Sequence, residues 1–161
     1  MDRVDSILKQ WRTERPDLEV GPMGTLGRLK RLSAQLARRT ETVFAEYDLT
    51  PADFDVLATL RRAGSPYTLT PSALIEWTMV TSGTMTHRVD RLQKAGYVKR
   101  TRNPEDGRGF QVALTSTGLA LIDAAVTRHV ENQHALVTGL NVEERSELDR
   151  LLAKWLSAFE E

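Results

Sequence analysis

The 161-residue sequence contains no cysteine, and this absence excludes several classes of protein. A disulfide-stapled secreted fold, a cysteine-ligated zinc site, a cysteine nucleophile and a thiol redox site all require the missing residue. The sequence also lacks a run of about 18 apolar residues, the length that a helix needs to cross a bilayer. Its first residues are acidic and lead into no apolar segment, so we expect a cytoplasmic protein without a membrane partner.

The composition is that of a folded protein, with 40% apolar and 27% charged residues. The length suits one domain, or one domain with long appended helices. The 22 Lys+Arg balance the 22 Asp+Glu, but the charges are unevenly distributed. Residues 81–111 hold seven basic and three acidic residues, whereas residues 141–161 hold three basic and six acidic ones. This separation fits a protein that approaches a polyanion with one face, and a solvated helix face explains it equally well.

Helix signals divide the N-terminal half of the chain. Apolar spacing predicts a short helix that ends before Pro16 and, after a linker over 16–24, a long helix to about Tyr47. Thr50-Pro51-Ala52-Asp53 then combines an N-cap hydroxyl, a proline at the first helical position and a carboxylate at the third. This combination predicts a helix over 51–63.

The remaining signals predict an alternation of helices with one β-hairpin. The expected elements are helices over 70–77 and 82–95, strands over 97–102 and 110–114 around a turn at 103–109, and helices over about 116–138 and 142–159. Short helices followed at once by a hairpin are typical of a winged helix-turn-helix. We therefore predict a mainly α fold with a small β-hairpin wing, in which 82–95 is the recognition helix.

The expected recognition helix has two dissimilar sides. At about 100° per residue, Met85, Val89 and Leu92 share a core-facing side. The opposite side can meet base edges and phosphates in a major groove, with Arg91 and His87 as the candidates for base contacts. Hydroxyls at the helix N-terminus suit a phosphate oxygen, although plain capping explains them too. The predicted DNA contacts of this segment are Thr81, Ser82, Thr84, His87, Arg91 and Lys94.

The wing supplies two further candidates for DNA contact. Arg108 stands between Gly107 and Gly109 at the hairpin tip, where no bulky neighbour prevents its entry into a narrow minor groove. A solvated loop charge is the alternative, and the preceding recognition helix favours the DNA contact. Arg102, at the end of the first strand, is the second candidate.

Three ordered motifs resemble the MarR family of winged helix-turn-helix repressors. They are Leu-Thr-Pro-Ala-Asp-Phe-Asp-Val-Leu at 49–57, Thr-Ser-Gly-Thr-Met-Thr-His-Arg-Val-Asp-Arg-Leu at 81–92, and Asn-Pro-Glu-Asp-Gly-Arg-Gly at 103–109, followed by Leu114-Thr115. The resemblance covers nearly the whole chain and implies a homodimer that binds a pseudo-palindromic operator and is usually released by a small ligand. It assigns dimerisation to helices in 1–47, including an extra first helix, and in 116–161, and DNA binding to 48–115. One departure is Gly107, where the wider family often has arginine.

A narrower resemblance is to the urate-responsive subfamily, which binds its ligand with a tryptophan, an aspartate and two arginines. The matching residues here are Trp11, Asp55, Arg88 and Arg100. The helical spacing independently places Arg88 beside the core-facing side, where its guanidinium needs an anion or a carboxylate. Asp55 and Arg100 are its expected neighbours before the ligand binds. A planar, anionic urate can accept bidentate hydrogen bonds from arginine while stacking on Trp11.

Simpler explanations remain for part of this set. Trp11 continues the apolar stripe of the first helix, so packing at an interface explains it equally well. Asp55 falls roughly opposite the apolar side of its own helix and requires a neighbouring helix or subunit to bury it. Other anionic or aromatic ligands also fit, so urate is the leading candidate rather than the only one.

Enzymatic function finds little support in the sequence. The glycines at 21, 24 and 27 lack the preceding strand and following lysine of phosphate-binding loops, so we interpret them as a helix-entry loop. His129 and His134 lie on different helix faces, which argues against a metal pair. We predict no enzyme, no metal and no cofactor. The alternatives to a ligand-released regulator are a constitutive architectural DNA-binding protein and a winged-helix module for protein contacts.

Overall fold

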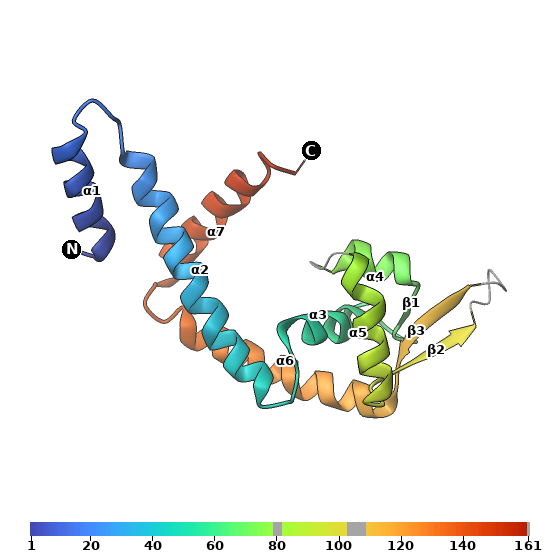
Figure 1. Cartoon of the computed structure of the whole chain (residues 1–161). Coiled ribbons are helices and arrows are strands. Elements are labelled where there is room, and N and C mark those ends of the chain that lie inside the picture. Colours follow the sequence, from blue (N-terminus) through green and yellow to red (C-terminus); the bar gives the residue numbers. More distant parts are fainter. Residues whose placement is uncertain (79–81, 103–108, 161) are drawn as a thin grey trace. The chain divides into compact units, whose positions relative to one another are not determined.

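The computed structural model describes residues 1–78, 82–102 and 109–160, and of residues 82–84 only the backbone (Figure 1). The chain divides into two compact units, Met1–Thr42 and Val43–Glu161, here called the N-terminal and C-terminal units. The elements are α1 (Arg3–Glu14), α2 (Gly21–Ala45), α3 (Pro51–Arg62), β1 (Thr68–Leu69), α4 (Pro71–Trp77), α5 (Ser82–Lys94), β2 (Val98–Arg102), β3 (Phe110–Leu114), α6 (Ser116–Leu136) and α7 (Val142–Leu156). The predicted fold class, mainly α with a small β wing, is confirmed.

The N-terminal unit has a small core of its own. Asp2 and Asp5 form a capping box that begins α1. Arg28 of α2 binds both carboxylates, because its Nε donates to Oδ2 of Asp2 at 2.8 Å and its Nη2 pairs with Asp5. The apolar cluster of this unit consists of Val4, Leu8 and Val20.

Glycines at the start of α2 allow α1 to pack closely. α2 begins at Gly21, so the expected linker over 16–24 is shorter and the expected helix-entry loop is wrong. A Cβ added at Gly24 would lie 3.0 Å from Cδ1 of Leu8, and one at Gly27 would lie 3.5 Å from Cγ1 of Val4. The close helix contact thus explains the glycines and outweighs their poor helix propensity.

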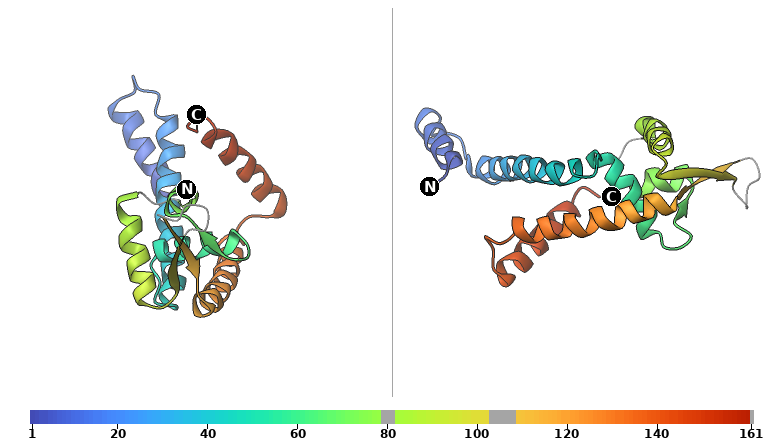
Figure 2. Two further views of the ribbon diagram at one scale, coloured as in Figure 1. Left: turned by 90° about the vertical axis from the view of Figure 1, so that its right-hand side faces the viewer. Right: turned by 90° about the horizontal axis from the view of Figure 1, so that it is seen from below.

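A small antiparallel sheet forms the wing of the C-terminal unit, with the strand order β1-β3-β2. β2 and β3 pair with Arg100 opposite Val112, which confirms the predicted hairpin. β1 was not predicted; it has two residues, of which Thr68 pairs with Ala113, and so few residues give no readable alternation. The hairpin projects from the helices of this unit (Figure 2).

Helices α3 to α6 and the sheet share one apolar core. Thr50 and Asp53 form the predicted capping box of α3. Gly96, with φ of +80°, ends α5 in the left-handed conformation that favours glycine. The core includes Val56, Leu57, Leu60, Leu74, Met85, Leu92, Val112 and Ile122. Ile122 lies on α6, so a helix that we assigned to dimerisation also completes the core of the winged-helix unit.

The first turn of α6 fits tightly against the start of the wing. Thr115 caps the helix and donates a hydrogen bond from Oγ1 to the carbonyl of Gly96 at 2.7 Å. Its backbone N–H donates to the carbonyl of Tyr97 at 3.0 Å. A Cβ added at Gly118 would overlap that same carbonyl oxygen of Tyr97. Glycine is therefore required where α6 meets the segment between α5 and β2.

α7 has no buried residue in this single chain. Its exposed apolar side chains are Val142, Leu148, Leu151, Leu152, Trp155 and Leu156. An amphipathic helix with such a face normally packs against another surface.

His129 of α6 lies among aromatic rings within the C-terminal unit. Its ring centroid is 5.1 Å from that of Phe44 and 5.0 Å from that of Phe54. Its Nδ1 is buried and has no hydrogen-bond partner within the described part of the chain. Desolvation lowers the pKa of His129 below the ordinary histidine value, because the apolar surroundings disfavour the charged ring.

This pKa makes the free energy of unfolding depend on pH. Below the unfolded pKa of about 6.5, the unfolded chain binds a proton that the folded chain accepts less readily. We expect His129 to reduce stability as the pH falls from about 6.5 through its folded pKa, and to have no such effect above that window. Thermal unfolding of the wild type and of His129→Gln at pH 7.5 and pH 5.5 measures this.

The exposed His134 on the same helix offers the matched control. The acid-induced fall in Tm should be smaller in His129→Gln than in the wild type, and His134→Gln should behave like the wild type. An identical fall in Tm for the wild type and His129→Gln would show that His129 is not the group responsible.

Candidate nucleic-acid interface and adjoining pocket

α5 has the two sides that its sequence predicts. Met85, Val89 and Leu92 are buried in the core. His87, Arg91 and Lys94 are exposed. The helix thus offers one histidine and two cations to solvent, while three apolar side chains anchor it from the other side.

The other predicted DNA contacts are described in part. Ser82 and Thr84 belong to the first turn of α5, whose side chains lie outside the description. Thr81 and Arg108 are outside the described residues altogether. Arg102 ends β2 with an exposed side chain, so the described part of the wing adds a cation to those of α5.

Arg91 forms an ion pair with Asp53 of α3. The side chain of Arg91 is 49% exposed, whereas that of Asp53 is 1% exposed. Nη2 of Arg91 also lies 3.4 Å from Oγ1 of Thr50, the N-cap residue of α3. The sequence identified Asp53 only as a capping residue, and its ion pair with the recognition helix was missed.

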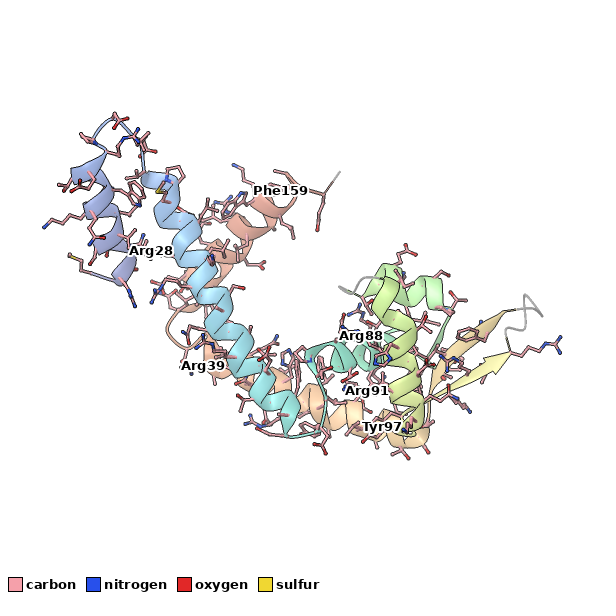
Figure 3. The ribbon with its side chains drawn as sticks, viewed as in Figure 1. Arg28, Arg39, Arg88, Arg91, Tyr97 and Phe159 are labelled. Atoms are coloured by element: carbon pink, nitrogen blue, oxygen red, sulfur yellow. The ribbon has the colours of Figure 1, made fainter. Side chains whose placement is uncertain are left out.

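A pocket of about 470 Å³ lies between the first turn of α3 and α5. It is lined by Thr50, Pro51, Ala52, Asp53, His87, Arg88 and Arg91. Figure 3 shows Arg88 and Arg91 projecting from α5 toward α3. Oδ1 of Asp53 and Nε of Arg88 are buried, and neither has a partner among the described residues. Two of the residues that line the pocket therefore each carry a buried polar atom without a partner among the described residues.

Three of the four residues predicted for ligand binding, Asp55, Arg88 and Arg100, belong to the C-terminal unit, and Trp11 belongs to the N-terminal unit. Arg88 is half-buried, as its place beside the core-facing side predicts, and it lines the pocket together with His87 and Arg91. Asp55 is half-buried on α3 and, like Arg100, is not part of the lining. Trp11 is 41% exposed on α1 in the N-terminal unit.

Arg100 differs from its expected role as a neighbour of Arg88. Its guanidinium pairs with Asp90 and donates to Oε1 of Gln93, both on α5. The same guanidinium lies 5.1 Å from the ring centroid of Phe110 on β3. Arg100 thus fastens the hairpin to the recognition helix. The carboxylate of Asp90, one turn from Gln93, offers an exposed ion-pair partner on the face of α5 that meets β2.

The described residues include no cluster of His, Cys, Asp or Glu that could hold a metal ion. Within the same residues, no helix is both long and apolar enough to cross a membrane.

Comparison with known proteins places this geometry in a family. A sequence model of the MarR family matches residues 47–109. The HTH-type transcriptional regulator PecS of Dickeya dadantii is 42% identical over 151 residues, which cover 94% of this chain and 91% of PecS. The multiple antibiotic resistance protein MarR of Escherichia coli is 32% identical over 139 residues, or 86% of this chain and 93% of MarR. The chain belongs to the MarR family.

Solved structures of MarR and of another DNA-binding protein share the fold. A cysteine-to-serine variant of E. coli MarR in complex with operator DNA superposes with a TM-score of 0.74 at 31% identity, covering 85% of this chain and 97% of that one. BpsR of Bordetella bronchiseptica, whose DNA binding is regulated by 6-hydroxynicotinic acid, gives a TM-score of 0.72 at 25% identity, covering 86% and 95%. α5 and the β2–β3 hairpin are therefore the recognition helix and wing of a MarR-family fold.

Proposed function

We propose that this MarR-family protein is a cytoplasmic, sequence-specific transcriptional repressor that binds a pseudo-palindromic operator as a homodimer and is released by a small anionic or aromatic ligand such as urate. The observation that carries the proposal is the exposed side of α5, where His87, Arg91 and Lys94 face solvent beside the wing. A helix with this arrangement can read base edges in a major groove while cations bind the phosphates.

The exposed apolar face of α7 supports the homodimer. The side chains of Leu148, Leu151 and Trp155 are between 38% and 47% exposed in the single chain. Burial of such side chains against a second copy is favourable at about 25 cal/mol per Å². A two-fold dimer would then place two recognition helices on half-sites about one helical turn of DNA apart.

The pocket beside α5 supports a ligand response. Its Arg88 has a buried Nε without a partner among the described residues, and an arginine binds a planar anion through two parallel hydrogen bonds. The pocket volume of about 470 Å³ falls in the range of small-molecule sites. Regulation of BpsR by a hydroxylated aromatic acid supports an effector of this chemical class.

A fluorescence-anisotropy titration tests the function. The protein is titrated onto the intergenic DNA that flanks its own gene and onto a random duplex of equal length, at near-physiological salt, with and without urate or 6-hydroxynicotinic acid. The proposal requires preference for the intergenic DNA and weaker binding with a ligand. A preference indifferent to ligands would favour a constitutive architectural protein, and no preference would favour a protein-interaction module.

Arg88→Ala separates ligand binding from DNA binding. The substitution removes a lining residue whose Nε has no partner among the described residues, so we expect release to require at least about a tenfold higher urate concentration. Operator affinity without ligand should change less than about threefold, since Arg88 is half-buried whereas His87, Arg91 and Lys94 are exposed. Both quantities come from the same anisotropy titration.

Lys94→Ala is the matched variant on the exposed side of α5. It removes a cation that does not line the pocket, so operator affinity should fall while the ligand response stays intact. If Arg88→Ala weakened operator binding as much as ligand release, Arg88 would be a groove contact.

A further inference from the structure

The ion pair between Asp53 and Arg91 joins a buried carboxylate to the solvent side of the recognition helix. Oδ2 of Asp53 accepts hydrogen bonds from both the backbone N–H and the hydroxyl of Thr50, the former at 2.9 Å. These bonds fix the carboxylate at the start of α3. The carboxylate of Asp53 is therefore held in place on α3, and Arg91 of α5 forms its ion pair with this fixed group.

The ion pair between Arg91 and Asp53 is expected to persist when Arg91 contacts DNA. A carboxylate that is 1% exposed loses most of its hydration, and the guanidinium is the cation paired with it. Moving Arg91 away would leave a buried charge uncompensated, which is strongly unfavourable. A contact of Arg91 with DNA must therefore be made with its guanidinium still held by Asp53.

The ion pair with Asp53 leaves other N–H donors of Arg91 available for a contact with DNA. The contacts with Asp53 and Thr50 both involve Nη2, and a guanidinium has five N–H donors on three nitrogens. About half of the side chain is exposed, on the solvent side of α5. A fork of donors with a fixed plane suits the O6 and N7 acceptors of guanine, which lie side by side in the major groove.

We propose that Asp53 is a positioning residue for DNA recognition, which holds the Arg91 guanidinium so that its remaining donors read a guanine in the operator. This inference rests on the proposed function. Asp53 contributes to specificity rather than to overall attraction, because its own negative charge opposes the approach of phosphate.

Asp53→Asn tests the role with little change in shape. The amide oxygen can still accept the capping bonds of Thr50, but the charge that holds Arg91 is lost. Affinities for the operator duplex and for a random duplex are measured by anisotropy. We expect operator affinity to fall about tenfold, with affinity for random DNA unchanged or slightly higher. The specificity ratio, which is the affinity for the operator divided by the affinity for random DNA, should therefore fall about tenfold.

Three further variants test whether loss of the contact between Asp53 and Arg91 is the cause of the lower specificity ratio. Asp48→Asn removes an exposed carboxylate shortly before α3 at a residue whose φ of 54° asparagine also tolerates, and it should leave the specificity ratio unchanged. Arg91→Lys keeps the charge opposite Asp53 but loses the fork, and should lower the ratio as Asp53→Asn does. Adding Asp53→Asn to an Arg91→Ala protein should lower the ratio no further, because the two residues act through one contact.

The outcomes separate this inference from the proposed function. If the wild type shows no preference for the operator, the proposed function fails and the role of Asp53 fails with it. If the wild type is specific but Asp53→Asn leaves the ratio unchanged, or lowers it equally in the Arg91→Ala background, the positioning role alone is overturned. Equal tightening on both duplexes would also overturn it, because Asp53 would then only repel DNA.

Discussion

Replacing Gly118 with alanine is expected to destabilise the C-terminal unit by about 3 kcal/mol, the upper part of the usual range for overpacking. The new Cβ would overlap the carbonyl oxygen of Tyr97, and that oxygen belongs to the backbone. The same carbonyl accepts the N–H of Thr115, so the clash cannot be relieved without disturbing the cap of α6. The gain of about 1 kcal/mol in helix propensity is too small to offset this. Urea unfolding measures the change.

Gly139→Ala provides the matched substitution. A Cβ at Gly139 would meet no heavy atom of the described residues within 4 Å, so the midpoint of unfolding should stay within experimental error of the wild type. A Gly118→Ala protein as stable as the wild type would mean that α6 and Tyr97 separate readily, and that the observed contact contributes little to the fold.

Removal of Arg91 is the second substitution with a large expected effect on stability. Arg91→Ala leaves the buried Asp53 carboxylate without its cation, and loss of one partner of a buried pair costs about 3–5 kcal/mol. Arg91 is itself 49% exposed, so we expect a smaller loss, about 2–3 kcal/mol, in the free energy of unfolding. Urea denaturation at neutral pH measures it.

Substitution of the other partner, Asp53, should lower the free energy of unfolding much less. Asp53→Asn leaves a half-exposed arginine that water can solvate, so it should cost less than about 1 kcal/mol. The double variant should be close to Asp53→Asn alone, because no buried charge remains. Equal losses for the two single variants would mean that the charge of Asp53 is well solvated in the folded protein.

Local signals in the sequence account for most of the fold. Thr50 and Pro51 mark the start of α3, Gly96 marks the end of α5, and the apolar side of α5 follows from its spacing. Each of these depends on residues within one or two turns, where propensity and capping dominate. The start of α2 was misjudged because glycine normally opposes helix formation. The contact of Gly24 with Leu8 that overrides this preference is formed only in the folded chain.

The candidate site was less predictable because it depends on contacts between distant segments. Spacing correctly placed Arg91 and His87 on the solvent side of α5 and indicated that Arg88 would be less exposed than either. It could not show that Arg91 would meet Asp53 of α3, or that Arg100 would pair with Asp90. A one-dimensional pattern fixes the direction of a side chain on its own helix, but its partner depends on how the helices and strands pack.

The attachment of Arg100 to α5 has a mechanical consequence for any response to a ligand. β2 is held to the recognition helix by an ion pair and a hydrogen bond from one guanidinium, which also covers the ring of Phe110. These contacts oppose separation of the recognition helix from the hairpin. If the ligand proposed above moves α5, β2 is expected to move with it, because the contacts of Arg100 join the two elements. The contacts of the recognition helix and of the wing with DNA would then change together rather than one after the other.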